Sequence, residues 1–458
     1  MLFITPSFIF LFLPIVLCLA WFLKERYLIP TILIASIFFY WLGNGLLILL
    51  IFYIGLILYF QIKKQYLADG VTIALILFPL FWFKYAQFLI DSFSTIVEID
   101  IPTYSGELPL GISFFTFQSI AYYVDTKREG KNYLNTFSEV ILFLTFFPQL
   151  VAGPILKSKN FKSDLSKTSR YEKNEILSGI LRISNGLIKK LIFADSLSRL
   201  VDININTFQM NMSSLAAWII VLAFTFQIYF DFSGYCDIAV GIGKLLGFNL
   251  PENFNFPYQA SSFSEFWKRW HITLSSFFRD YVYIPLGGNR NGTLITYRNL
   301  WITFFLTALW HGANYTFLLW GAIHGFFLSI EKLTSKSRTY KSFIKNRFVT
   351  FFLVSISWIP FRFSNLESVK AIFQSLFSFN TINDKAIALL ASEFNLLTLI
   401  AFTAGFLSIV VNADLLSKIK NQVIQKELIY FSYILFIFLT AILSVFMSDY
   451  YPFIYFRF

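Results

Sequence analysis

The feature that most constrains the fold of this chain is a set of long apolar stretches without Asp, Glu, Lys or Arg. The clearest are Met1–Leu23, Tyr27–Ile62 and Asn299–Ile330, and the Gly43-Asn44-Gly45 turn offers a place to split the second. About 20 apolar residues are enough for a helix to cross a bilayer. Because a backbone in lipid finds no water to bond, it must pair its own amides and carbonyls, as a helix does. These stretches therefore predict membrane-spanning helices.

Further stretches of the same kind continue the pattern: Ile203–Phe230, Phe394–Ala413 and Leu428–Ser448. Weaker candidates lie around residues 70–92, 110–124, 136–155, 176–194 and 348–361. With 57% hydrophobic and 14% charged residues, the composition is that of a polytopic membrane protein. We predict an all-α integral membrane fold of about 10–12 transmembrane or re-entrant helices plus interfacial helices. It should form one membrane-embedded domain over residues 1–458.

The net charge of +11 does not indicate nucleic-acid binding, because the basic residues gather between the apolar stretches. The densest groups are Lys157–Lys173 and Lys332–Arg347. Cytoplasmic loops of membrane proteins are rich in Lys and Arg, and anionic lipid attracts them. Cys18 and Cys236 stand alone, so they predict no disulfide, metal site or thiol nucleophile. We expect membrane lipid as a partner, no nucleic acid, and no bound metal or cofactor.

All three histidines of the chain, His271, His311 and His324, fall between Ser262 and Gly325. Histidine is costly in lipid and titrates near neutral pH, so this clustering is the main functional signal. Ser262 and Glu265 have the spacing of a capping box that begins a helix.

The residues from Ser262 to Tyr281 predict one amphipathic helix at the membrane surface, with aromatic residues on one face and basic residues on the other. His271 lies about 80° from the centre of the aromatic stripe, at its edge. From there it can face either the protein on the lipid side or a watery cavity.

His311 and His324 interrupt an uncharged run and are 13 residues apart. On one unbroken helix they would point about 140° apart, so both can face one substrate only if the helix breaks near Gly312-Ala313-Asn314. His311 is a candidate catalytic residue or a buried residue that ties helices together. For His324 the structural role is favoured.

A third polar motif lies in the stretch Gln227–Asp237. Gln227, Asp231, Gly234 and Tyr235 share one helical face, and Asp237 lies off that face. Carboxylates at such a position must be paired, hydrated or protonated. They either hold helices together or line a polar cavity and contact substrate.

Together these motifs resemble the membrane-bound O-acyltransferase family, and within it the bacterial alginate O-acetylation proteins, with the teichoic-acid D-alanyl transfer proteins as relatives. The matching residues span most of the chain: Leu108–Asp125, Phe146–Pro154, Gln227–Asp237, Pro251–Tyr258, Phe263–Arg290 and Leu309–Gly325.

The resemblance implies a multi-helix enzyme of the bacterial inner membrane with a funnel on each face. An acyl thioester, acetyl-CoA or an acylated carrier protein, would enter from the cytoplasm, and a polysaccharide acceptor would come from outside. The two would meet near His311 and His271. A lipase-like (SGNH-type) extracytoplasmic partner would complete transfer onto the polysaccharide.

The chemistry of O-acyl transfer needs a base to deprotonate a hydroxyl and donors to hold the developing oxyanion. His311 is the predicted base, and His271 either orients the acyl group or takes the second proton. Asn314 is a candidate amide donor, and Arg269 and Arg290 are candidates for the phosphates of the donor.

The chain closes on Phe453-Ile454-Tyr455-Phe456-Arg457-Phe458, which is similar to the tail of the small membrane peptide that accompanies teichoic-acid D-alanylation proteins. Tyr455 is the only hydroxyl of this segment, and a phenolate is a fair nucleophile toward a thioester. Tyr455 is therefore a candidate acyl relay, and an aromatic membrane anchor is the alternative.

Two further classes of function stay open. A polysaccharide or lipid transporter would account for Asp231 and Asp237 within an apolar stretch, but not for the clustered histidines. A non-catalytic scaffold would tolerate replacement of His311. D-alanyl transfer from a carrier protein is the alternative within the acyltransferase class.

Overall fold

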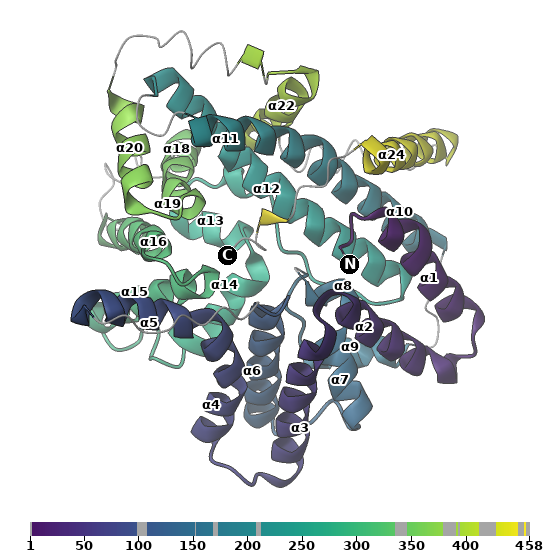
Figure 1. The fold of residues 1–458 in the computed structure, drawn as a ribbon. Coiled ribbons are helices and arrows are strands. Elements are labelled where there is room, and N and C mark those ends of the chain that lie inside the picture. Colours follow the sequence, from purple (N-terminus) through teal and green to yellow (C-terminus); the bar gives the residue numbers. More distant parts are fainter. Residues whose placement is uncertain are drawn as a thin grey trace. The chain divides into compact units, whose positions relative to one another are not determined.

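The computed structural model describes residues 2–98, 108–151, 153–167, 173–207, 212–334, 346–378, 391–392, 394–411, 427–447 and 453–454. Within these ranges the chain consists of helices and loops without a strand. The predicted all-α class is thereby confirmed. The chain divides into two compact units, one of Met1–Ile183 with Cys236–Pro251 and one of Ser184–Tyr235 with Glu252–Phe458 (Figure 1).

The first unit contains most of the amino-terminal helices, joined by short π- and 3₁₀-helical turns labelled η. Its elements are η1 (Phe8–Phe12), α1 (Leu13–Phe22), η2 (Glu25–Tyr27), α2 (Leu28–Asn44), η3 (Gly45–Ile48), α3 (Leu49–Lys64), α4 (Asp69–Leu80), η4 (Phe81–Tyr85), α5 (Ala86–Val97), α6 (Ile112–Glu129), α7 (Phe137–Thr145), α8 (Phe147–Leu150), α9 (Ser158–Leu165) and most of α10 (Lys173–Leu187).

Apolar packing organises this unit: α3, α4 and α6 contact one another, and α7 packs on α2 and α3. Leu28–Lys64 and Asp69–Val97 are long and apolar enough to cross a membrane. The break predicted at Gly43-Asn44-Gly45 is confirmed, since α2 ends at Asn44 and Gly45 adopts φ +53°. A complete capping box of Thr136 and Glu139 begins α7.

The second unit contains the histidines. Its elements are the last residues of α10, η5 (Ile188–Ala194), α11 (Asp195–Thr207), α12 (Ser214–Leu245) up to Tyr235, η6 (Pro257–Gln259), α13 (Phe263–Arg269), α14 (Ile272–Phe278), η7 (Arg279–Tyr283), α15 (Thr293–His311), α16 (Tyr315–Thr334), α18 (Arg347–Ser357), α19 (Ile359–Arg362), α20 (Leu366–Phe377), α22 (Leu396–Val410) and α24 (Glu427–Met447).

α12 is the most buried of the long apolar helices, with 78% of its most hydrophobic window inside the protein. It begins at Ser214, later than the predicted stretch Ile203–Phe230, because α11 continues to Thr207. The predicted spans Phe394–Ala413 and Leu428–Ser448 correspond closely to α22 and α24. The chain is a multi-pass membrane protein.

α15 and α16 form a close helical pair. A Cβ atom on Gly321 of α16 would lie 2.7 Å from the Ala308 Cβ and 2.9 Å from the Phe304 carbonyl oxygen of α15. Only glycine permits this approach, and it brings the carboxyl end of α15 against α16. The helix breaks near Gly312, which is the condition for His311 and His324 to face one substrate, since α15 ends at His311 and α16 begins at Tyr315.

Candidate active site

His271 lies at a break between α13 and α14 rather than inside one long helix. α13 ends at Arg269, α14 begins at Ile272, and His271 adopts φ +42° in the left-handed region. The single helix predicted over Ser262–Tyr281 is wrong at this point. Left-handed geometry costs an L-residue about 1–2 kcal/mol. Strain of this kind concentrates at functional sites.

The loop that precedes α13 explains the break, because its backbone pairs with the two helix ends. The Asn255 N–H donates to the Arg269 carbonyl at 2.9 Å, and the Ile272 N–H donates to the Asn253 carbonyl at 3.0 Å. These long-range bonds satisfy backbone groups that an uninterrupted helix would pair internally.

The start of α13 follows the predicted capping pattern with a shift of one residue. The Ser262 hydroxyl accepts the Glu265 N–H at 3.1 Å, as predicted. The Glu265 carboxylate, however, accepts the N–H and the hydroxyl of Ser261 rather than the N–H of Ser262. Glu331 of α16 adds a second carboxylate at the same helix end, where it accepts the Phe263 N–H.

The tautomer of His271 follows from its contact with Asn253. The Asn253 Oδ1 atom accepts the Thr273 N–H at 3.1 Å and the Thr273 hydroxyl at 2.8 Å, so it is the amide oxygen. The His271 Nδ1 atom lies 3.3 Å from the same oxygen and must donate to it. In the neutral ring the Nε2 atom then carries the lone pair. A base oriented through its other nitrogen is a recurring catalytic arrangement.

His271 is fully buried and lies in a short turn outside the long apolar spans. Burial lowers the pKa of His271 to about 3, because the charged imidazolium loses its hydration. The ring is therefore neutral at neutral pH and offers Nε2 as a proton acceptor.

Replacing His271 with glycine and with alanine distinguishes the effect of backbone strain on stability from the effect of losing the imidazole on catalysis. Glycine adopts φ +42° without a Cβ penalty, so we expect His271→Gly to melt at a higher temperature than His271→Ala. Both variants lack the imidazole, and both should lose about 100-fold or more of acyl transfer. Thermal unfolding in detergent and an acyl-transfer assay measure the two effects. Parent-level transfer by either variant would contradict a role for the ring.

His311 ends α15 and is buried among aromatic rings. Its ring centroid lies 4.9 Å from those of Trp310 and Trp320 and 5.0 Å from that of Phe361. The Trp310 ring also lies 5.9 Å from the His271 ring. The structure thus brings His271 and His311 to the same tryptophan.

The turn after His311 has no room for a larger residue. A Cβ atom on Gly312 would lie 2.2 Å from the Phe317 ring, so Gly312 allows α16 to fold back directly after His311.

Both ring nitrogens of His324 have side-chain hydrogen-bond partners. The Trp267 indole N–H donates to His324 Nδ1 at 3.3 Å, so Nδ1 carries no proton in the neutral ring. The protonated Nε2 then donates to the Ser357 hydroxyl at 3.0 Å, and that hydroxyl donates to the Val354 carbonyl at 2.6 Å. This chain of bonds ties α13, α16 and α18 together and supports the structural role.

We expect His324→Ala to lower stability more than activity. The substitution leaves the buried Trp267 N–H and the Ser357 hydroxyl without their histidine partner, at about 1–3 kcal/mol for each group. Acyl transfer per folded molecule should remain well above that of the His271 variants. A variant that unfolds like the parent protein and transfers no acyl group would contradict the structural role.

A buried group of charges lies on η5, at the start of α11 and on α12. The Lys190 Nζ atom lies 2.6 Å from Asp195 Oδ1 and 2.7 Å from Asp231 Oδ1, and all three side chains are at most 7% exposed. The sequence pattern singled out Asp231 but not Lys190 or Asp195. In the sequence, Lys190 lies beside Lys189 inside the weak candidate span at 176–194, and Asp195 follows directly after that span.

The remaining predicted residues take other places. Arg269 forms an ion pair with Glu265 at 2.8 Å and donates to the Asn255 carbonyl, and Arg290 is exposed in the loop after η7. Asn314 caps α16 by accepting the Thr316 N–H, and its amide nitrogen donates to the Ser364 carbonyl. These contacts favour a structural role for Asn314, and its contact with substrate stays a prediction.

Two other predicted residues belong to α12. Gln227 is buried, and its Oε1 atom has no hydrogen-bond partner among the described residues. Asp237 belongs to the first unit, where it forms an ion pair with Arg182 at 2.7 Å. The prediction that either one contacts substrate stays open. Tyr455 lies outside the described residues, although Ile454 immediately before it is described.

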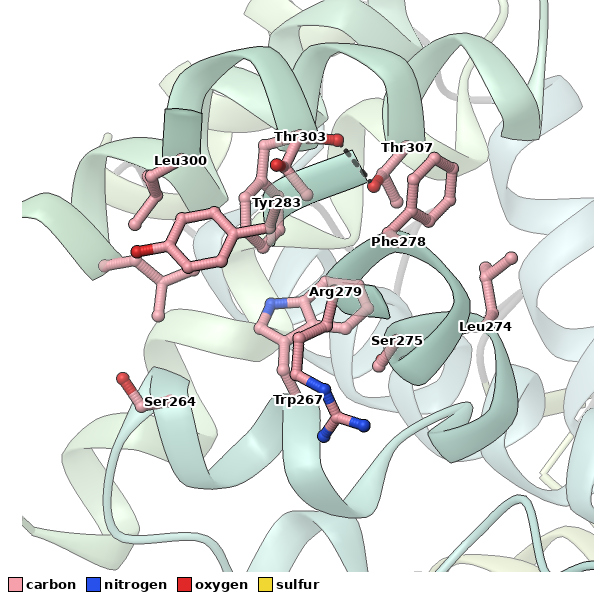
Figure 2. Close-up of a pocket in the computed structure, with 12 residues that line it drawn as sticks. Ser264, Trp267, Leu274, Ser275, Phe278, Arg279, Tyr283, Leu300, Thr303 and Thr307 are labelled. Carbon is pink, nitrogen blue, oxygen red and sulfur yellow. Dashed lines mark hydrogen bonds between the residues drawn. The ribbon is translucent and has the colours of Figure 1, made fainter. Parts of the chain in front are cut away.

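A pocket of about 220 Å³ uses the same helices as the histidines (Figure 2). Its mainly apolar wall includes Leu274 and Ser275 of α14, shortly after His271, and Thr307 of α15, one turn before His311. Figure 2 shows side chains from α13, α14, η7 and α15 converging on this space. Among the described residues that line the pocket, Arg279 is the one that is charged, and it forms an ion pair with Asp280 at 2.8 Å.

The model of the membrane-bound O-acyltransferase (MBOAT) family matches residues 32–361. The matched region includes His271, His311 and the pocket. The chain belongs to the membrane-bound O-acyltransferase family. It is thus a membrane-embedded O-acyltransferase, as the sequence motifs predicted.

Several relatives of this acyltransferase are similar over much of the chain. A probable alginate O-acetylase of Pseudomonas aeruginosa is 39% identical over 400 residues, which cover 83% of this chain and 76% of the relative. A peptidoglycan O-acetyltransferase of Helicobacter pylori is 35% identical over 439 residues, which cover 86% and 83% of the two chains. A teichoic acid D-alanyltransferase of Bacillus subtilis is 27% identical over 259 residues, covering 54% of this chain and 65% of the relative.

Proposed function

We propose that this acyltransferase takes an acetyl group from a cytoplasmic thioester, acetyl-CoA, for O-acetylation of an extracytoplasmic polysaccharide. The observation that carries the proposal is the arrangement of His271, held in one tautomer by Asn253, against the tryptophan that also contacts His311. The relatives named as alginate and peptidoglycan O-acetylating enzymes support acetyl as the group transferred and a glycan as the acceptor.

In the proposed reaction His311 is the general base and Tyr455 the first acceptor. His311 removes the proton of the Tyr455 hydroxyl as the phenolic oxygen attacks the thioester carbonyl. The bond from the carbonyl carbon to sulfur breaks, and the thiolate leaves and takes up a proton. His311 returns the tyrosyl proton to that thiolate, and His271 orients the acyl group or takes the second proton. The product is an acetyl ester of Tyr455.

The second step passes the acetyl group on. A serine hydroxyl of an extracytoplasmic lipase-like (SGNH-type) partner attacks the ester carbonyl of acetyl-Tyr455, and the phenol is released with its proton restored. The aryl ester is an activated donor, which favours this direction. The partner then acetylates the polysaccharide. The setting proposed for this pathway is the inner membrane of a bacterium.

The pocket in Figure 2 supports a thioester donor with a long, largely uncharged arm. Pockets that bind small molecules are mostly apolar with a few placed polar groups, and this lining combines aromatic rings with the hydroxyls of Ser275, Thr303 and Thr307. The phosphates of the donor would remain outside the apolar space, where Arg290 is exposed. Arg269 is the weaker candidate for them, because Glu265 already neutralises it.

Purified protein in liposomes distinguishes the donors. We expect radiolabel to leave acetyl-CoA in the presence of the protein and to appear on the protein or an added acceptor. The matched sample contains the same label on an acyl carrier protein. Transfer only from the carrier protein would overturn the acetyl-CoA proposal in favour of the D-alanyl-type reaction.

A further inference from the structure

The described end of the chain is bonded directly to Asp231. The Ile454 N–H donates to Asp231 Oδ2 at 2.7 Å, and both groups are buried. The Phe453 ring packs against the rings of Tyr235 at 4.3 Å and Phe232 at 5.6 Å between centroids. Residues 453 and 454 therefore dock on α12 through one charge-assisted hydrogen bond and two ring contacts.

This docking point lies beside the candidate catalytic residues. The Phe232 ring, which contacts Phe453, also lies 4.7 Å from the His271 ring. Phe232 follows Asp231 directly on α12, so the same part of the helix contacts both the chain end and His271.

Asp231 is suited to this contact because it has a donor on each side. Its Oδ1 atom faces the Lys190 ammonium at 2.7 Å, and its Oδ2 atom faces the Ile454 N–H. A buried carboxylate is costly unless paired and hydrogen-bonded, and Lys190 provides the opposite charge. An amide at this position would have only one oxygen and could satisfy only one of the two donors.

Asp195 provides the contrast within the same charge group. Its Oδ1 atom also faces Lys190, at 2.6 Å, but its Oδ2 atom has no hydrogen-bond partner among the described residues. An asparagine at 195 can therefore keep its oxygen toward Lys190. Asp195→Asn and Asp231→Asn each remove one negative charge from the same group of charges. Only Asp231→Asn leaves a second hydrogen-bond donor, the Ile454 N–H, facing an amide that has one oxygen.

We propose that Asp231, paired with Lys190, is a positioning residue that clamps the chain at Ile454, the residue directly before the proposed acyl acceptor Tyr455 in the sequence. The proposal assigns Asp231 to the protein's own carboxyl-terminal segment instead of to substrate. Its consequence for catalysis rests on the proposed acyl relay through Tyr455, whereas the clamp itself does not.

A spin label on the full-length protein tests the clamp without reference to activity. The label is attached at Phe458→Cys in a Cys18→Ser background, because Cys18 is exposed and Cys236 is buried. We expect slow label motion in this parent and in Asp195→Asn, and fast motion in Asp231→Asn. Slow motion in Asp231→Asn, or equally fast motion in Asp195→Asn, would overturn the clamp.

Ile454→Pro provides a second route that leaves the Asp231–Lys190 pair in place. Proline removes the N–H that Asp231 accepts, so the label should again move fast. Combining it with Asp231→Asn should add no further mobility, since both changes remove one bond. Additive effects on mobility would overturn the assignment.

Kinetics then separate positioning from substrate binding. A charge-assisted hydrogen bond of this kind predicts that Asp231→Asn lowers kcat for acetyl transfer by about 10- to 100-fold. The KM for acetyl-CoA should stay unchanged. A rise in KM with normal kcat would overturn the positioning role in favour of substrate contact. Fast label motion with normal kcat and KM would leave the clamp standing and refute its positioning role in acetyl transfer.

Discussion

His311→Ala and His311→Gln should abolish surface O-acylation while the protein still folds and inserts. His311 is the proposed base, and removal of a general base typically costs about 10²–10⁴-fold in rate. The ring packs against Trp310, Trp320 and Phe361, and Gln preserves part of this packing. The loss in His311→Gln should therefore be one of chemistry more than of stability.

The measurement is the ester-linked acetyl content of the cell-surface polysaccharide, compared at matched membrane levels of each variant. His324→Ala is the matched control, because it also removes a buried histidine of the α15–α16 pair but not one placed in the reaction. Near-normal acylation by well-expressed His311→Ala would exclude the base assignment. That result would favour the scaffold class instead.

Tyr455→Phe should be as severe as the loss of His311 if Tyr455 carries the acyl group. The substitution keeps the aromatic ring and removes only the oxygen, so a membrane anchor would tolerate it. Without that oxygen the relay has no nucleophile. The acyl group then stays on the thioester donor and does not reach the partner. We expect acylation below about one hundredth of the parent level, the scale of a lost catalytic group.

Acylation of the surface polymer, measured with the Tyr451→Phe variant alongside, checks this expectation. Tyr451 lies four residues before Tyr455, outside the segment Phe453–Phe458, and has no role in the proposed relay. If Tyr455→Phe acylates the polymer as well as the parent protein does, the segment is an anchor and the relay is wrong.

Much of the fold follows from local sequence, because lipid leaves an apolar stretch little choice but a helix. α22 and α24 agree with their predicted spans, and the break at Asn44 occurs at the predicted turn. The start of α12 was misplaced, because α11 extends through Thr207 into the predicted span. Apolar content alone does not mark where one helix ends and the next begins.

The site was predictable in its residue types but not in its geometry. The clustering of the histidines and their motifs in the sequence single out His271 and His311. The helical pattern around His271 was real, yet backbone bonds from Asn253 and Asn255 interrupt it. These bonds join residues 14 and 19 positions apart, and contacts over such distances have no periodic signature in the sequence.

Lys190 and Asp195 could not be assigned to a charge group from local sequence either. A lysine inside an apolar stretch reads as a span boundary, and only its pairing with Asp231 on another helix reveals the charge group. The bond from Ile454 to Asp231 joins positions 223 residues apart, so sequence patterns could not have connected them.

The central claim is that this acyltransferase moves an acetyl group from a thioester by means of His311. A single-turnover reaction of purified protein in liposomes with radiolabelled acetyl-CoA tests it most directly, with His311→Gln alongside at equal folded concentration. The account predicts release of the CoA thiol together with label on the protein or acceptor in the parent, and about 100-fold less of both in His311→Gln. Equal thiol release and equal labelling by the two proteins would contradict it.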